Sequence, residues 1–223
     1  MEIGNQARPN IFDLEIKKGL NIYAHVLEVD ERVILAKSEN ASKEVDVFPN
    51  AKSVESVSGE KLLAIKEPDL EQVRKDLQEI HKKGIRAIAV IFMHSYIYSK
   101  HEELVGKIAK EIGFTQISLS SHVFPRAKIV PRGQTALVDA YLNPKITDYI
   151  ESFTKGFDEN IHKKVNLFFM QSDGGLASAT SFTGVRAILS GPAGGIVGYS
   201  FATLDHKFNT NKKPALGFDM GGT

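Results

Sequence analysis

The chain of 223 residues is long enough to form one sizeable domain, or two small ones, around a hydrophobic core. Its 28 Lys and Arg residues balance 27 Asp and Glu residues, and the formal net charge of +1 excludes a strong field that would attract nucleic acid or an anionic membrane. The absence of cysteine excludes disulfides, thiolate metal ligands and a thiol nucleophile from this chain.

The first third of the chain has a mixed pattern. Short stretches of alternating apolar and polar residues at 23–29 and 44–48 predict strands separated by polar turns. From Pro68 the pattern changes to that of a helix, which Gly84 is placed to end. The apolar stripe of this helix consists of Leu70, Val73, Leu77 and Ile80.

An alternation of strands and helices follows. Residues 85–95 predict a buried strand, and a helix is expected to begin where Ser99 and Glu102 have the spacing of a capping box. Gly113 follows the end of this helix, and residues 115–121 predict the next strand. The order of elements indicates an α/β fold with at least one parallel pair of strands. The predicted apolar face of the helix comprises Leu104, Val105, Ile108 and Ile112.

The longest unbroken apolar run, residues 87–93, is far shorter than the roughly 20 residues that a membrane-spanning helix needs. The start of the chain also lacks the basic and apolar regions of a signal peptide. We therefore expect a protein of the cytoplasm that does not contact membranes.

The last part of the chain predicts a third helix from Arg132 onward, which Pro144 should kink or restart with Asn143 as its cap. The elements expected after it are a strand at 165–172, a turn at 173–175, a helix at 178–189, a glycine-rich turn at 190–195, a helix through Ala202 and a final strand at 215–218.

Three glycine clusters in this last third can expose backbone N–H groups to an anion, because glycine lets a chain approach a phosphate without a Cβ in the way. They are Ser172-Asp173-Gly174-Gly175, Gly191-Pro192-Ala193-Gly194-Gly195 and Asp219-Met220-Gly221-Gly222-Thr223. A tight turn is the alternative for the first cluster, and close helix packing through Gly194, Gly198 and Ala202 is the alternative for the second.

The third cluster combines complementary residue types. A carboxylate at a strand end can hold Mg²⁺ directly or through water, while glycine N–H groups and a threonine hydroxyl can bind phosphate. A plain hairpin turn is the alternative for this cluster.

Three other residues are weaker candidates. His94 stands at a predicted strand end, although a single histidine is more often a surface or structural residue than a catalytic one. Arg132 offers a cation near a helix start to a carboxylate or phosphate, and Asp139 follows it by about two helical turns. The alternative for Arg132 and Asp139 is a solvated pair.

Several long segments spread over nearly the whole chain occur together in one known family. They are IGNQARPNIFDL, ISLSSHVFPRAKIVPRGQTALVDAYLNPKI, MQSDGGLA, AILSGPAGGIVGYS and GFDMGGT. In this order they resemble the hydantoinase A/oxoprolinase family, and specifically its oxoprolinase branch. The resemblance implies an actin-like ATPase fold, in which two ribonuclease-H-like lobes, each a mixed sheet with flanking helices, close over ATP. It also implies ATP-driven hydrolysis of 5-oxoproline, a cyclic amide, to glutamate.

The resemblance also implies roles for particular residues. Asp219, Gly221, Gly222 and Thr223 match the start of the family's second phosphate hairpin, with ATP and Mg²⁺ as cofactors and Asp219 as the Mg²⁺ contact through water. Ser172, Asp173 and Gly174 are the first candidates for contacts with 5-oxoproline, and His94 and Arg132 come after them.

The family's first phosphate hairpin, Gly-Gly-Thr-Phe-Thr-Asp, does not occur in this sequence. We therefore expect an incomplete lobe that lacks turnover by itself, from a parent that is a homodimer acting on a small molecule and not on nucleic acid. Its expected parts are a strand-rich region at 1–66, an α/β region at 67–210 and a truncated start of the second lobe at 211–223. The alternatives are a hydantoin-cleaving or ketone-carboxylating relative and a non-catalytic assembly fragment.

Overall fold

The computed structural model describes residues 21–36, 51–157, 165–204, 213–214 and 216–221. It divides the chain into two compact units, Met1–Tyr141 and Leu142–Thr223. The strand predicted at 44–48 and the candidate residues Gly222 and Thr223 lie outside the described residues. The division into regions at 66 and 210 stays a prediction. None of the described helices is long and apolar enough to cross a membrane.

The first unit begins with a small antiparallel sheet in the order β1-β3-β2. Its strands are β1 (Arg32–Leu35), β2 (Lys52–Glu55) and β3 (Lys61–Lys66). Val33, Leu62 and Ala64 form the buried side of this sheet. The strand predicted at 23–29 is wrong, because these residues form no ladder and instead pack Leu27 and Val29 against the neighbouring core.

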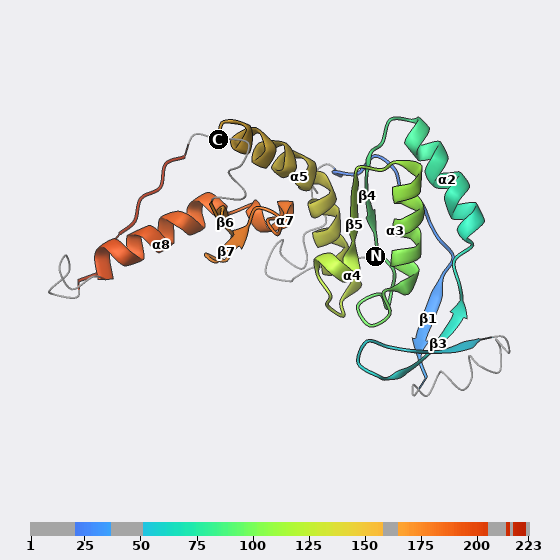
Figure 1. The fold of residues 1–223 in the computed structure, drawn as a ribbon. Coiled ribbons are helices and arrows are strands. Elements are labelled where there is room, and N and C mark those ends of the chain that lie inside the picture. The colour runs from blue at the N-terminus through green and yellow to red at the C-terminus, as the bar shows by residue number, and fades with distance from the viewer. Residues whose placement is uncertain (1–20, 37–50, 158–164, 205–212, 215, 222–223) are drawn as a thin grey trace, which may run out of the picture. The chain divides into compact units, whose positions relative to one another are not determined.

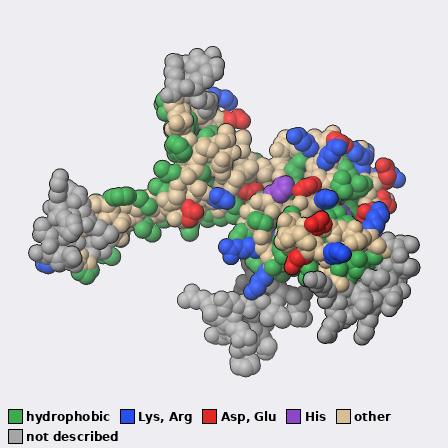
Figure 2. Space-filling model, turned by 60° about the horizontal axis from the view of Figure 1, so that its bottom comes forward, with side chains coloured by type: hydrophobic (Ala, Val, Ile, Leu, Met, Phe, Trp, Pro, Cys, Tyr) green, Lys and Arg blue, Asp and Glu red, His purple; other side chains and the backbone are tan. Residues whose placement is uncertain are grey.

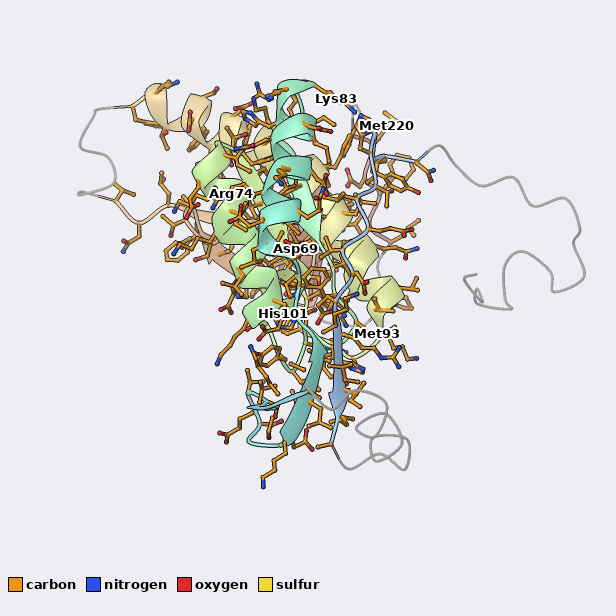
Figure 3. All side chains as sticks on the ribbon, turned by 90° about the vertical axis from the view of Figure 1, so that its right-hand side faces the viewer. Asp69, Arg74, Lys83, Met93, His101 and Met220 are labelled. Carbon is orange, nitrogen blue, oxygen red and sulfur yellow. The ribbon has the colours of Figure 1, made fainter. Side chains whose placement is uncertain are left out.

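Helix α2 (Leu70–Lys82) forms where the sequence predicts it. Asp69 precedes it as the N-cap, and its carboxylate accepts hydrogen bonds from the backbone N–H groups of Glu71 and Gln72. Figure 3 shows Asp69 at one end of this helix and Lys83 at the other. Gly84, with a φ of 91°, follows the helix in the left-handed conformation that glycine tolerates.

The core of the first unit is the parallel pair β4 (Ala87–Val90) and β5 (Gln116–Leu119), in register from Ala87 opposite Gln116 to Val90 opposite Leu119. Helix α3 (Lys100–Ile112) connects them and packs Val105, Ile108 and Ala109 into the core. In Figure 1, α2 and α3 lie on one side of these strands and the start of α5 lies on the other. The predicted parallel α/β arrangement is therefore confirmed.

The predicted start of α3 is wrong in one respect. Ser99 makes no side-chain cap, and its hydroxyl donates instead to the Glu103 carboxylate at 2.6 Å. The capping-box partner Glu102 is fully buried and points elsewhere, whereas the predicted core residue Leu104 is 41% exposed. The buried face is therefore rotated toward Glu102.

Helix α4 (Ser120–Val123) follows β5 directly, and helix α5 (Ile129–Lys155) begins in the first unit and ends in the second. Helix α5 continues through Pro144, so the predicted restart at Asn143 is wrong. The Pro144 nitrogen cannot donate a hydrogen bond within this helix. The Asn143 side-chain oxygen accepts from the backbone N–H of Gly184 at 3.0 Å instead of capping a helix.

The second unit contains an antiparallel hairpin of β6 and β7 and two further helices. Its elements after α5 are β6 (Phe168–Met170), β7 (Leu176–Ser178), α7 (Gly184–Ala187) and α8 (Ser190–Leu204). The helix predicted at 178–189 is reduced to α7, since residues 176–178 pair as a strand. The predicted glycine-rich turn at 190–195 lies inside α8.

The final strand predicted at 215–218 is also wrong for the described residues of that stretch. Residues 216–218 have no regular structure, and the exposed fractions of Leu216 and Phe218 are 94% and 78%. A strand needs a neighbouring backbone with which to pair, and no described residue provides one.

Aromatic side chains contact one another in the second unit, around the buried Phe182. Phe169 stacks on Phe182 at 5.3 Å between ring centroids and meets Tyr149 and Phe153 edge-on. Large apolar side chains, including Phe201, remain exposed on α8, and Figure 2 shows hydrophobic side chains along this helix.

Candidate functional site

The carboxyl ends of β4 and β5 define the candidate site, because parallel strands end at one edge of a sheet and ligands of open α/β folds bind there. We call this region the carboxyl-edge site. It consists of the loop 91–99 after β4, residues 120–128 after β5, and the first turn of α5. All of these residues belong to the first unit.

Glu102 is the central acceptor below this edge. It is fully buried, and its two carboxylate oxygens accept four hydrogen bonds of 2.6–2.9 Å. The donors are the Phe92 N–H, the Ser120 hydroxyl, and both the N–H and the hydroxyl of Ser121. Four donors match the acceptor capacity of a carboxylate, so the hydrogen-bonding capacity of this group is filled.

Arg132 is the corresponding donor. Its side chain is fully buried, and its five N–H groups have five acceptors. The Nε atom donates to the Ser120 hydroxyl at 3.0 Å, so Ser120 links Arg132 to Glu102. The other acceptors are the backbone carbonyls of Arg126, Ala127, Phe92 and Met93.

These bonds correct the sequence prediction for Arg132. The guanidinium retains no donor for a carboxylate or phosphate ligand. The alternative prediction, a solvated pair with Asp139, also does not hold for Arg132, because its side chain is buried. Burial lowers the pKa of Arg132 from its ordinary value, and the nearby Glu102 opposes this shift. Arg132 therefore acts as a structural cation that fixes the loops around it.

Asp139 is also buried, and no hydrogen bond or ion pair joins it to Arg132. Its carboxylate accepts from the Ser118 hydroxyl at 2.8 Å, and Ser118 in turn accepts from the Gln116 side chain. This places Asp139 behind β5 as a support for the strand. A solvated pair with Arg132 is thereby excluded.

Glu102, Ser120 and Ser121 were not predicted as site residues. A signal was present in the helix, because Glu102 stands three residues before Val105 and seven before Ala109, which are both buried. A charged residue on the buried stripe of a helix indicates an internal partner.

His94 differs from its neighbours. Its Nδ1 atom is buried without a hydrogen-bond partner, and no described residue bonds to its Nε2 atom. Its pKa is lowered first by burial and then by the positive charges of Arg132 and Arg32, while the negative charge of Glu31 opposes this shift. His94 is therefore a neutral imidazole with unused hydrogen-bonding capacity near pH 7.

A second histidine, His101, lies at the start of α3 and contacts Glu31 and Tyr98. His101 Nδ1 lies 2.8 Å from the Glu31 carboxylate, and both side chains are buried. The Tyr98 ring meets His101 edge-on at 5.1 Å. Figure 3 shows His101 at the start of α3 and Met93 at the edge of the same unit. The Glu31 carboxylate thus has His101 as a hydrogen-bond partner.

The second unit holds the predicted glycine clusters. The Ser172 hydroxyl donates to the carbonyl of Arg186 at 2.7 Å and accepts from the N–H of Leu189 at 2.9 Å. Asp173 accepts from the N–H of Gly175, and Gly174 has a φ of 82°. These bonds stabilise a tight turn, which was the alternative to ligand binding for this cluster.

The second cluster lies in α8. A Cβ on Gly194 would meet the Met170 side chain at 3.7 Å, so this glycine packs against β6. Gly195 lies against the Tyr199 ring of the same helix, and a Cβ on Gly191 would meet no described atom within 4 Å. Packing therefore accounts for Gly194.

The third cluster is exposed at Asp219 and Gly221, its described candidates. The described residues contain no group of three or more His, Cys, Asp or Glu side chains that could hold a metal ion.

The first unit is therefore an α/β domain with a fixed polar network under its carboxyl edge. Two protein-family models match the sequence. The family model described as hydantoinase/oxoprolinase N-terminal region matches residues 1–113, and the one described as hydantoinase/oxoprolinase matches residues 132–223. The chain belongs to the hydantoinase/oxoprolinase family.

A curated relative is similar over the whole chain. 5-Oxoprolinase 1 of Arabidopsis thaliana is 49% identical over 223 residues, which are 100% of this chain and 17% of that protein. The chain therefore spans about one-sixth of the length of this relative.

Two solved structures share the fold. An ATP-dependent caprolactamase from Pseudomonas jessenii matches 89% of this chain and 27% of its own, with a TM-score of 0.56 and 20% identity. A nucleotide-free acetone carboxylase matches 68% of this chain and 21% of its own, with a TM-score of 0.54 and 19% identity. At these identities the likeness concerns the fold alone.

Proposed function

We propose that this chain is part of an enzyme that hydrolyses 5-oxoproline to glutamate with ATP. The observation that carries the proposal is the 49% identity to 5-oxoprolinase 1 over the whole chain. The fold shared with an ATP-dependent caprolactamase, whose substrate name also denotes a cyclic amide, supports it.

The chemistry explains the need for a nucleotide. An amide carbonyl is a poor electrophile, and a five-membered lactam is stable toward water. Transfer of the γ-phosphoryl group of ATP to the amide oxygen makes the carbon a better electrophile, and water attacks it. The tetrahedral carbon then expels the ring nitrogen as an amine, which breaks the C–N bond, opens the ring and leaves an acyl phosphate. A second water hydrolyses this acyl phosphate and releases phosphate. The products are glutamate, ADP and phosphate.

We further propose an actin-like arrangement in which β4, β5 and their helices belong to the first lobe. The segment from Asp219 to Thr223 then begins a phosphate hairpin, with Asp219 holding Mg²⁺ through water. The structure describes Asp219, Met220 and Gly221 of this segment, which are exposed and have no regular secondary structure.

A hybrid enzyme tests the proposed reaction. In it, this chain replaces the matching 223 residues of Arabidopsis 5-oxoprolinase 1. We expect the hybrid to release glutamate and phosphate only when both ATP and 5-oxoproline are present, and the 223-residue chain to release neither. A folded hybrid whose ATP hydrolysis ignores 5-oxoproline would contradict the proposal.

A matched pair of variants tests the hairpin in the same hybrid. Asp219→Asn removes the carboxylate proposed for Mg²⁺, so we expect the rate to fall by about 100-fold or more. Asp148→Asn makes the same change at an exposed site on α5 and should leave the rate unchanged. Equal rates for the two variants would remove Asp219 from the proposed site.

A ketone-carboxylating or hydantoin-cleaving activity is the second candidate, favoured by the fold shared with acetone carboxylase. The same hybrid separates these activities when hydantoin, caprolactam, or acetone with bicarbonate replaces 5-oxoproline. We expect 5-oxoproline to give the highest rate.

We also propose that the hybrid is a homodimer, and light scattering tests this by measuring its molecular mass. A non-catalytic assembly fragment is the remaining alternative. Such a fragment would bind a separate chain and would convert none of these substrates.

A further inference from the structure

We propose that His94 is the ligand-binding residue of the carboxyl-edge site and that its Nε2 atom contacts an anionic oxygen of a carboxylate or a phosphate. This inference deepens the proposed function by assigning a contact to this chain, and it rests on that function only for the identity of the anion. It separates two residues, His94 and Arg132, that the sequence analysis placed together behind Ser172, Asp173 and Gly174.

The first argument is saturation of the neighbouring groups. Glu102 accepts four hydrogen bonds, Arg132 donates five, and the Ser120 hydroxyl both donates to Glu102 and accepts from Arg132. A ligand that used one of these groups would have to break a buried hydrogen bond. No described residue makes a hydrogen bond to either ring nitrogen of His94. The imidazole can therefore bind a ligand without breaking a buried hydrogen bond.

The second argument is that the loop around His94 is fixed on both sides. Before it, the Phe92 N–H donates to Glu102, and the Phe92 and Met93 carbonyls accept from Arg132. After it, the Ser95 hydroxyl donates to the Phe92 carbonyl at 3.1 Å. The His94 carbonyl itself accepts from two N–H groups of the following turn, at 3.0 Å each. The network of Glu102 and Arg132 thus fixes the backbone on both sides of His94 but makes no hydrogen bond to its ring. A side chain held in this way is preorganised to contact a ligand.

The third argument concerns the position of the imidazole proton. A buried N–H without an acceptor is costly, so the proton of neutral His94 belongs on Nε2 and the bare lone pair on the buried Nδ1. His94 then presents an N–H donor to a ligand. An incoming anion also converts this neutral donor into a charge-assisted one by favouring a second proton.

The surrounding charges favour an anion over a cation. Two cations, Arg132 from α5 and Arg32 from β1, bear on His94, together with one anion, Glu31, whose carboxylate lies 2.8 Å from His101 Nδ1. The Tyr96 ring lies 6.2 Å from the His94 ring. The two arginines attract an anion, and an Nε2–H donor likewise needs an acceptor.

His81 shows that an unpartnered nitrogen is not a site by itself. Its Nε2 atom is also buried without a partner, but its ring meets Phe114 at 5.1 Å within the apolar core cluster. His81 lies at the opposite end of β4 from the carboxyl edge, since it precedes the strand. It therefore serves as an internal control.

Histidine-ring NMR on the 223-residue chain tests the inference directly. The His94 signal, assigned by its loss in His94→Gln, is titrated with pH in chloride, in inorganic phosphate and in 5-oxoproline. We expect the midpoint of His94 to rise in at least one of the two anions, while that of exposed His122 does not follow it. A rise with phosphate alone assigns a phosphate contact, and a rise with 5-oxoproline alone assigns a carboxylate contact. An unchanged His94 midpoint in both anions would overturn the inference.

Two variants separate the donor from the bulk of the ring. The amide of His94→Gln reaches the position of Nε2 and should keep the anion affinity within about threefold, whereas His94→Phe fills the space without a donor and should lose about tenfold. If both variants fold and bind the anion with equal affinity, the inference is overturned. Failure of the hybrid enzyme to use 5-oxoproline would leave these binding results intact, so the two proposals fail separately.

Discussion

Removal of the Arg132 guanidinium tests the buried network most directly. Arg132→Met keeps an apolar stem of similar length but removes the donor to the Ser120 hydroxyl and to four backbone carbonyls. Of these carbonyls, that of Phe92 keeps the Ser95 hydroxyl as a donor. It also leaves the fully buried Glu102 carboxylate without its positive neighbour. Loss of one partner from a buried charged network costs about 3–5 kcal/mol. That is a large part of the roughly 5–15 kcal/mol that stabilises a domain.

Amide hydrogen exchange measures this effect locally. The N–H groups of Phe92 and Ser121 donate to Glu102, so their protection reports the network itself. A loss of 3–5 kcal/mol corresponds to roughly two to three and a half orders of magnitude in protection. Urea unfolding followed by circular dichroism gives the global value, because the chain has no tryptophan.

Arg126→Met is the matched control, since this exposed side chain contributes mainly a cation–π contact with Phe124. We expect it to cost less than about 1 kcal/mol. The double variant Glu102→Gln with Arg132→Met should cost less than the sum of the two single changes by about 1 kcal/mol or more. If Arg132→Met resembles Arg126→Met, or if the two network changes simply add, the reasoning about this network is refuted.

Further predictions concern the second unit and pH. Gly184→Ala places a Cβ 2.6 Å from the backbone nitrogen of Asn143 and should cost about 1–3 kcal/mol in urea unfolding, whereas Gly198→Ala, with no described atom within 4 Å, should stabilise α8 by up to about 1 kcal/mol. Gly174→Ala should cost about 1 kcal/mol because its φ of 82° strains any other residue; a neutral effect would show that the turn relaxes. His94 has a lowered pKa in the folded state, so the unfolded state binds the proton first and stability should fall as pH drops below the ordinary value of 6.5. His94→Gln should flatten this slope, as urea midpoints over that pH range can measure, and an unchanged slope would assign the dependence to other groups.

The parts of the fold with local signals were predictable from the sequence. Helix α2 has a regular apolar stripe, an N-cap at Asp69 and a glycine after its end, and all three determine the helix without distant contacts. The parallel pair β4 and β5 follows from two short apolar runs separated by one helix. These signals depend only on residues close in the chain.

The errors arise where a distant residue decides the structure. Glu102 has the spacing of a capping-box residue, but Ser120 and Ser121 offer it buried donors from another strand end. Residues 176–178 form a strand because β6 lies opposite them, although their sequence also suits a helix. Propensity is a weak guide at such positions because tertiary contacts outweigh it.

The three glycine clusters show the same limit for the candidate site. They look alike in sequence, yet Gly174 adopts a positive φ in a turn, Gly194 packs in a helix, and Gly221 lies in an exposed irregular segment. Glycine content indicates where the backbone can approach another group. It does not say whether that group is a phosphate, a methionine or water.

The comparison of Arg132 with His94 turns on an energy that residue type alone does not reveal. If Arg132 gave one donor to a ligand, a buried backbone carbonyl would lose its partner, at a cost of about 1–3 kcal/mol that would offset much of a new hydrogen bond. His94 has no such bond to break among the described residues, and its neighbours are already held in place by Arg132. The charged residue that looked better suited to bind an anion is therefore the poorer ligand, and its contribution is to hold a neutral histidine where an anion can reach it.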